Sequence, residues 1–338
     1  MPDNKKIVFR ADGSKKLGFG HLKRCAVLGK ALKELGHEIF FLSAGADGAV
    51  ESFFGAQGFT FKVVKASASR ETVTEHLTYM GSLGSSVTVL DSYGVDDAYR
   101  AALKDAGNVV IALDDVYSHY YHADMVINHN PSADSSRYAD FGGKILAGPH
   151  YALIDPAFGG VSRSGPSKAP PGILVTMGGT DAKNQTRRVL DLLDSVEEDF
   201  HITVLGGFYA GLPDVKRLSH PSDVISSTNE MPLLMGKCDA AITAGGVTCM
   251  ELACAGLPFL LLVTDEFQLD NAKAYHDSCA GIFAGAASEI SDEMLLNAIG
   301  EFVRNTERWS AMAENGRQLI GANGAKRAAA EISAITGK

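Results

Sequence analysis

The 338-residue sequence lacks several short motifs that would assign a function directly. It contains neither the Gly-x-Ser-x-Gly of common serine hydrolases nor the Gly-Lys-Ser/Thr of a Walker loop, which excludes the commonest members of both classes. No complete Gly-x-Gly-x-x-Gly follows the first apolar run, because Leu17–Gly20 holds only its first half. The five cysteines form no Cys-x-x-Cys pair, and their odd number disfavours a full disulfide framework. We therefore expect a reducing compartment and no zinc site.

Charge and the length of apolar runs exclude two further classes. The net charge is −9, so nucleic acid is not an expected partner. No apolar run approaches the length of a membrane span, and the first residues lead into a predicted strand without the apolar segment of a signal peptide. We expect a soluble, cytoplasmic protein without stable membrane association. The sequence gives no indication of the oligomeric state.

What the sequence does contain is a regular alternation of short apolar runs with helical patterns, typical of parallel sheets with crossover helices. The predicted strands are Ile7–Phe9, Glu38–Leu42, Phe59–Val64, Val87–Leu90, Val109–Leu113, Asp124–Ile127, Lys144–Leu146, Ile173–Met177, His201–Leu205, Val224–Ser226, Asp239–Thr243 and Phe259–Val263. The length and the 46% of hydrophobic residues suffice for two cores. The expected fold class is α/β, with two Rossmann-type, doubly wound parallel-sheet domains facing each other across a cleft.

A segment rich in glycine, proline and serine, residues 159–172, is the predicted linker between the domains. It separates an amino-terminal Rossmann-like domain, residues 1–158, from a carboxyl-terminal one, residues 173–320. The end of the chain has a helical pattern interrupted near Gly321–Gly324. We expect residues 321–338 to form a helix that packs back on the amino-terminal domain.

The first candidate site is the stretch Leu17–Arg24, which joins the first predicted strand to a helix expected over Ala26–Leu35. In open α/β sheets ligands bind at the carboxyl ends of the strands. Gly18 and Gly20 would let the backbone approach a ligand closely, and His21 can change its charge near neutral pH. A packing turn with an ordinary surface histidine explains these residues equally well.

The second candidate site lies in Ala244–Pro258, where two glycines turn the chain into a helix that opens at Val247 or Thr248. Free N–H groups at such a helix start attract phosphate. Glu251, one turn later, can accept hydrogen bonds from a ribose diol. Helix capping alone would also explain the pattern, but Gln268 and Asn271 after the next strand favour a nucleotide site.

Other polar groups at strand ends give weaker signals. Gly178–Asp181 could wrap a diphosphate or a base, and Asp91 with Tyr93 offers a carboxylate and a phenol, although a buried wall tyrosine fits as well. Asp114 and Asp115 could bind a divalent cation, but no neighbouring ligand completes a coordination set, so a solvated turn is expected. Four histidines are expected to be surface or structural residues: His119, His122, His129 and His150.

Taken together, these motifs resemble the UDP-2,4-diacetamido-2,4,6-trideoxy-β-L-altropyranose hydrolases of pseudaminic acid biosynthesis and the related spore-coat polysaccharide proteins. That family is similar to the two-domain glycosyltransferases of GT-B type. The resemblance covers nearly the whole chain. Its motifs are Gly18–Cys25, Asp91–Tyr93, Asn128–Asn130, Tyr151–Leu153, Gly178–Asp181 with Asn184, Gly245–Thr248 with Glu251, and Gln268 with Asn271.

The resemblance implies a GT-B-like hydrolase that cleaves a UDP-linked amino-deoxy sugar with inversion and needs neither metal nor cofactor.

 His21 would activate the water, Asp91 or Tyr93 would orient His21 or touch the sugar, and the second domain would hold UDP with Glu251 on the ribose. The free sugar would feed nonulosonic acid synthesis for flagellin glycosylation or surface polysaccharide. The expected substrate contacts are Gly18, Gly20, Arg24, Asn130, Tyr151, Gly178, Gly179, Thr180, Asn184, Gly245, Gly246, Val247, Thr248, Glu251, Gln268 and Asn271.

Two alternatives stay open at this point. A GT-B glycosyltransferase would use the same UDP-aminosugar donor, with an acceptor hydroxyl in place of water. A non-catalytic nucleotide-sugar binding protein would have His21 buried and satisfied away from the ligand. The sequence also departs from the family after Tyr151-Ala-Leu153: Asp155 and Ala157 stand where the family carries a basic residue and Glu, and His129 replaces Gln. The sugar could therefore be a different aminosugar.

Overall fold

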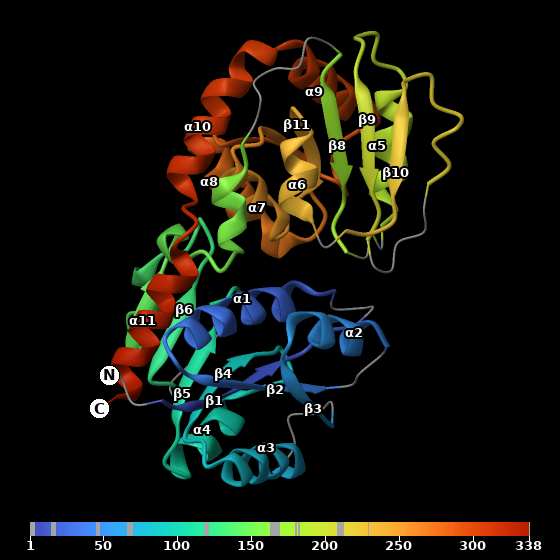
Figure 1. The fold of residues 1–338 in the computed structure, drawn as a ribbon. Coiled ribbons are helices and arrows are strands. Elements are labelled where there is room, and N and C mark those ends of the chain that lie inside the picture. The colour runs from blue at the N-terminus through green and yellow to red at the C-terminus, as the bar shows by residue number, and fades with distance from the viewer. Residues whose placement is uncertain are drawn as a thin grey trace. The chain divides into compact units, whose positions relative to one another are not determined.

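The computed structural model describes residues 4–14, 18–44, 48–65, 70–117, 122–162, 170–179, 181, 183–207, 213–228 and 230–337. The chain divides into two compact units (Figure 1). Unit 1 comprises Met1–Ile154 and Asn323–Lys338, and unit 2 comprises Asp155–Ala322. Residues 163–169 of the expected linker lie outside the described residues.

Unit 1 is built on a seven-stranded sheet in the order β3-β2-β1-β4-β5-β6-β7, in which all paired neighbours are parallel. Its strands are β1 (Lys6–Ala11), β2 (Glu38–Ala44), β3 (Thr60–Val64), β4 (Val87–Asp91), β5 (Val109–Leu113), β6 (Met125–Asn128) and β7 (Lys144–Ala147). The central strands are buried on both faces, which explains why their sequences are continuous apolar runs.

Helices cover both faces of this sheet (Figure 1). They are α1 (Gly20–Glu34), α2 (Gly48–Gln57), α3 (Arg70–Leu83), α4 (Asp97–Asp105) and α11 (Gly324–Thr336). Helices α3 and α4 bury Met80, Tyr99 and Leu103 against the strand residues Val8 and Val110. Helix α11 packs against α1, so the last segment of the chain completes the unit formed by its first half.

Unit 2 repeats this architecture with a six-stranded parallel sheet in the order β10-β9-β8-β11-β12-β13. The strands are β8 (Gly172–Thr176), β9 (His201–Leu205), β10 (Ser222–Ile225), β11 (Ala240–Ala244), β12 (Phe259–Val263) and β13 (Gly281–Ala286). The helices are α5 (Gln185–Leu193), α6 (Met231–Gly236), α7 (Thr248–Ala255), α8 (Leu269–Asp277), α9 (Asp292–Arg304) and α10 (Trp309–Leu319). Residues of α5, α9 and α10 form one core with the strands.

The structure confirms the α/β class, and every predicted strand occurs within two residues of its expected bounds. Strand β13 was not predicted, because its sequence Gly-Ile-Phe-Ala-Gly-Ala has little of the β-branched and aromatic character of a strand. The first helix begins at Gly20 rather than at Ala26. His21 therefore lies in the first turn of a helix instead of in a loop.

In each sheet, the early strands are added toward one edge and the later strands toward the other edge. The change occurs between β1 and β4 in unit 1 and between β8 and β11 in unit 2. Loops that follow the two strands at such a switch point diverge to opposite faces of the sheet and leave a crevice between them. Ligands of doubly wound folds bind there. The loops after β1 and β4 and those after β8 and β11 are thus the places to look for a site.

Candidate active site

His21 and Asp91 come from the two sides of the switch point of unit 1. Asp91 is the last residue of β4, and its Oδ1 lies 2.6 Å from Nδ1 of His21. A carboxylate can only accept, so Nδ1 carries the proton and Nε2 keeps its lone pair. No described residue bonds to Nε2, and this atom is not among the buried polar atoms that lack a partner. It therefore remains accessible as a proton acceptor.

Arg24, one turn further along α1, holds the same carboxylate with two hydrogen bonds. Its Nε donates to Oδ2 of Asp91 at 2.6 Å and its Nη2 to Oδ1 at 2.5 Å. Burial opposes the ionisation of Asp91, but the charges and hydrogen bonds of Arg24 and His21 outweigh it and hold the pKa of Asp91 well below its usual range. Cys25 adds a weak donor, with its Sγ 3.3 Å from Oδ2. Asp91 is thus a fixed anion.

Asp115 and Tyr93 extend this cluster on the other side of Arg24. Nη1 of Arg24 donates to Oδ2 of Asp115 at 3.0 Å, and the hydroxyl of Tyr93 lies 3.0 and 3.1 Å from the two carboxylate oxygens. The Tyr93 ring stands edge-on to His21, with 4.8 Å between the ring centres. Partial burial and Asp115 raise the pKa of Tyr93 well above its usual value, so Tyr93 is a neutral donor.

The expectation of a solvated turn at Asp114-Asp115 is wrong. Asp114 is buried and accepts hydrogen bonds from the backbone N–H groups of Val116 and Tyr117 and from the hydroxyl of Tyr138. Asp115 is bonded to Arg24 and Tyr93 as described above. The side chains that bind the two carboxylates, Tyr138 on Asp114 and Arg24 on Asp115, come from other segments of the chain, 24 and 91 residues away, so a local sequence pattern does not predict these bonds.

The segment after β6 lies close to the same charges. Asn128, His129 and Asn130 are all buried; Asn128 donates to the Tyr138 hydroxyl and its Oδ1 accepts the N–H of Asn130. Nδ1 of His129 accepts the N–H of Leu153. Burial, followed by the charge of Arg24, lowers the pKa of His129 to about 3. His129 was expected at the surface or in a structural role, and it is a buried, neutral residue.

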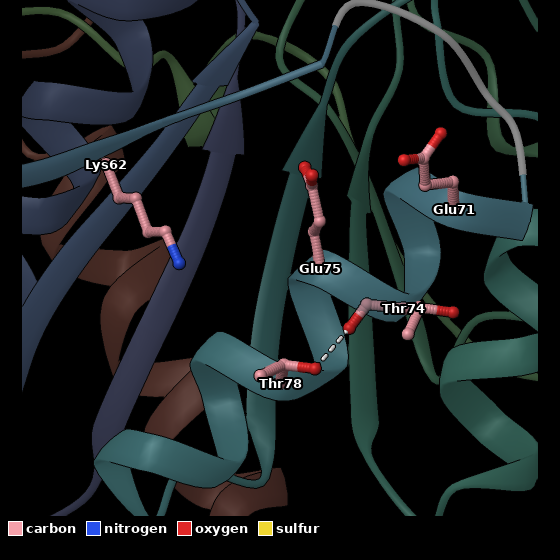
Figure 2. A pocket seen from close by; sticks show the side chains of 5 residues that line it. All are labelled: Lys62, Glu71, Thr74, Glu75 and Thr78. Atoms are coloured by element: carbon pink, nitrogen blue, oxygen red, sulfur yellow. Dashed lines mark hydrogen bonds between the residues drawn. The ribbon is translucent and has the colours of Figure 1, made fainter.

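A pocket of about 330 Å³ opens beside this cluster, and Asp91, Tyr93 and Asp115 are among its lining residues. A larger pocket, about 520 Å³, lies elsewhere in unit 1, between α3 and the edge strand β3 (Figure 2). It is lined by Lys62 and, from α3, by Glu71, Thr74, Glu75 and Thr78. The larger pocket contains none of the predicted site residues and does not lie at the carboxyl ends of the strands. The smaller pocket, beside His21 and Asp91, is therefore the better candidate for a ligand site.

The residues of unit 1 that are predicted to contact the substrate lie in different kinds of local structure. Gly18 has φ +74°, a conformation that favours glycine, and Gly20 begins α1. The guanidinium of Arg24 is engaged by Asp91 and Asp115. Tyr151 ends a short 3-10 helix, Pro149–Tyr151, with its ring against His150.

In unit 2 the turn after β11 presents free backbone donors. The N–H groups of Val247 and Thr248, at the start of α7, have no acceptor among the described residues, and α7 has no side-chain cap. Gly246 is exposed, and a Cβ added to it would meet no atom within 4 Å. The positive end of the helix dipole points the same way. This turn can therefore accept an anionic group such as a phosphate.

Three residues that follow this turn in the sequence are also predicted to bind the nucleotide. Glu251 lies on the first turn of α7 and is buried. Oε1 of Gln268 accepts the N–H of Thr264 at 3.0 Å, and Gln268 packs so closely on Gly245 that a Cβ there would lie 3.0 Å from it. Asn271 is in the first turn of α8. Gln268 thus fixes the position of the glycine turn.

The glycine turn after β8 lies beside the end of β9. Gly178 has φ +83°, and a Cβ on Gly207 would lie 2.2 Å from the carbonyl oxygen of Gly179, so both turns need glycine. Asp181 caps α5 by accepting the N–H groups of Gln185 and Thr186. Asn184 is exposed at the same helix start, with φ +54°. Thr180 lies outside the described residues.

Within the described ranges, no group of three or more His, Cys, Asp or Glu side chains is placed to hold a metal ion. None of the helices in that part of the chain is long and apolar enough to cross a membrane.

Comparison with known proteins supports the architecture of the two units. A crystal structure of Acinetobacter baumannii MurG superposes with a TM-score of 0.73 at 16% identity, over 98% of this chain and 99% of that one. The spinosyn rhamnosyltransferase SpnG, solved with thymidine diphosphate, gives a TM-score of 0.66 at 16% identity, over 98% and 100%. The fold is GT-B-like. Residues 172–332 of this GT-B-like chain match the glycosyltransferase family 28 C-terminal domain.

Proteins that are similar in sequence match long parts of the chain, but with low identity. The spore coat polysaccharide biosynthesis protein SpsG of Bacillus subtilis is 26% identical over 95% of both chains. The UDP-2,4-diacetamido-2,4,6-trideoxy-beta-L-altropyranose hydrolase of Campylobacter jejuni is 27% identical over 54% of this chain and 64% of its own length. The chain is thus similar to enzymes of sugar transfer and to one hydrolase.

Proposed function

We propose that the protein transfers the glycosyl group of a UDP-linked amino-deoxy sugar to a hydroxyl group that His21 activates. The observation that carries this proposal is the His21–Asp91 pair at the switch point of unit 1, with Nδ1 bonded to the carboxylate at 2.6 Å and Nε2 open. A base held in this tautomer can remove a proton from a hydroxyl as it attacks the anomeric carbon. The buried Asp91 anion stabilises the imidazolium that forms.

The leaving diphosphate is assigned to unit 2. Its negative charge grows as the glycosidic bond breaks, and the N–H groups of Val247 and Thr248 would stabilise that charge. Glu251 would accept hydrogen bonds from the ribose diol, as the resemblance implies. The match of residues 172–332 to a glycosyltransferase domain supports this assignment of the donor.

The attacking hydroxyl distinguishes two candidate activities. Structural neighbours that are transferases, the spinosyn rhamnosyltransferase and forosaminyltransferase, support a carbohydrate or other acceptor hydroxyl. Hydrolysis, in which water is the nucleophile, is the second candidate, and the relative from Campylobacter jejuni supports it. The geometry of His21 serves both, because water and an alcohol give up their proton to the same atom.

Incubation with UDP-aminosugars in water enriched in heavy oxygen would separate the two. If the enzyme is a transferase, UDP is released only when an acceptor is added, and the acceptor oxygen is retained in the product. If it is a hydrolase, UDP is released without an acceptor and the label is found on C1 of the sugar. A protein that binds UDP-sugars but releases no UDP under either condition would contradict the proposed function.

Replacing Gly246 by Ala tests the nucleotide site without disturbing the fold. The added methyl group would meet no protein atom within 4 Å, and Gly246 does not have a positive φ, so the thermal unfolding temperature should not change. A methyl group between the turn and a phosphate should weaken UDP binding about tenfold or more, equivalent to ~1.4 kcal/mol. Calorimetric titration with UDP measures this effect.

The matched control is Gly142→Ala in unit 1, where a Cβ also meets open space and φ is not positive. This variant should bind UDP like the parent protein. If Gly246→Ala binds UDP with unchanged affinity, the diphosphate does not contact this turn.

A further inference from the structure

Asp115 shares one guanidinium group with Asp91. Arg24 uses Nε and Nη2 for Asp91, and its Nη1 donates to Oδ2 of Asp115 at 3.0 Å. The same guanidinium approaches His21, with Nη2 3.0 Å from Nδ1. Because Nδ1 carries a proton that it donates to Asp91, this last contact places a cation against a donor. Arg24 therefore opposes a positive charge on His21.

The balance of charge around His21 depends on Asp115. The groups in contact with the ring are Asp91 on β4, Arg24 on α1 and Tyr93 in the loop after β4, and Asp115, in the loop after β5, binds both Arg24 and Tyr93. Tyr93 is neutral, and so is the nearby His129, whose pKa is lowered to about 3 by burial and by Arg24. Two carboxylates thus face one guanidinium. Without Asp115, only one carboxylate would offset Arg24.

The loop that carries Asp115 is held in place independently of Arg24. The carboxylate of Asp114 accepts the N–H groups of Val116 and Tyr117, and the hydroxyl of Tyr138 binds it from the segment after β6. This anchoring directs the next carboxylate toward Arg24. Asp115 also accepts a hydrogen bond from the hydroxyl of Tyr93, whose ring is perpendicular to that of His21, with 4.8 Å between the ring centres.

We propose that Asp115 is a positioning residue that sustains the proton affinity of His21 by offsetting the positive charge of Arg24. It also restrains Tyr93 against the imidazole ring. The catalytic consequence rests on the proposed function, in which His21 is the base. The electrostatic effect itself does not, because it follows from charges and distances in the folded protein.

The test is an NMR titration of the His21 ring in the full chain, with the resonance assigned by its loss in His21→Gln. In Asp115→Asn, the pH at which this resonance is half-shifted should fall, because one of the two carboxylates that offset the charge of Arg24 is lost. Asp115→Glu keeps the charge and should restore most of the parent behaviour. An unchanged or higher midpoint in Asp115→Asn would overturn the proposal.

A matched control is Asp292→Asn, which removes a carboxylate that also binds an arginine, Arg188, at 2.7 Å, but lies in unit 2. It should leave the His21 midpoint unchanged. The pH dependence of kcat/KM then separates the two proposals. If the NMR midpoint falls in Asp115→Asn but the acidic limb of the activity profile does not move with it, Asp115 acts as proposed and His21 is not the base.

Discussion

Replacing His21 by Gln is expected to lower the rate of UDP release by about 10²- to 10⁴-fold, the usual contribution of a general base. Glutamine keeps an amide that can donate to Asp91, but it offers no group that accepts a proton at neutral pH. The binding of UDP should be nearly unchanged, because the free N–H groups assigned to the diphosphate lie in unit 2. Single-turnover kinetics and calorimetric titration with UDP measure the two quantities separately.

His201→Gln provides the control for this substitution. His201 lies on β9, partly exposed, with Nε2 3.3 Å from a carboxylate oxygen of Asp223. It resembles His21 in having an aspartate partner but lies away from the switch point. Its variant should keep full activity. A His21→Gln protein that retains most of its activity would show that another group removes the proton, and loss of both activity and UDP binding would indicate a structural role.

Replacing Arg24 by Met is expected to destabilise unit 1 by about 3–5 kcal/mol, because the buried Asp91 charge loses its guanidinium partner and keeps only the hydrogen bonds of His21 and Cys25. Arg24 is 4% exposed and Asp91 is 1% exposed. Hydrogen exchange of the β4 amides measures the effect. The control, Arg308→Met, removes an exposed pair with Glu301 and should change stability by less than about 1 kcal/mol.

The same substitution should alter the dependence of stability on acid. The pKa of Asp91 is depressed in the folded protein, so its contribution to stability is fully present above the unfolded value of about 3.9 and is lost as the pH falls below it. The parent protein should therefore lose stability below about pH 4. In Arg24→Met the depression is smaller, so this loss should be shallower. An equal slope in both proteins would contradict the assigned charge state.

Most of the fold was predictable because the strands of a parallel sheet are buried on both faces and read as apolar runs. β4 and β12 are examples in which every residue is buried. β13 escaped prediction because its glycines and alanines form a strand only in the context of β12, with which it pairs. Helix α1 begins earlier than the sequence predicts, because Gly20 and His21 are poor helix formers and yet lie in its first turn.

The candidate site is predictable where a residue lies at the end of a strand or in the connection that follows it. This holds for Asp91 and His21, which the structure brings together with Tyr93 and Arg24. Their catalytic and binding roles stay predictions. The part played by Asp115 was not predictable, because its partner Arg24 is 91 residues away and carboxylates in turns are usually solvated. Only the sheet order, which places β5 next to β4, makes that pairing possible.

Unit 1 is discontinuous in the sequence, and this has a consequence for biosynthesis. Its last helix, α11, buries Ala328 and Ile332 and joins the turn before β2 through Ser333, whose hydroxyl lies 2.7 Å from His37. During translation, all of unit 2 leaves the ribosome before α11 does. Unit 2 can therefore complete its fold first, while the unit that carries His21 waits for the last helix to be made.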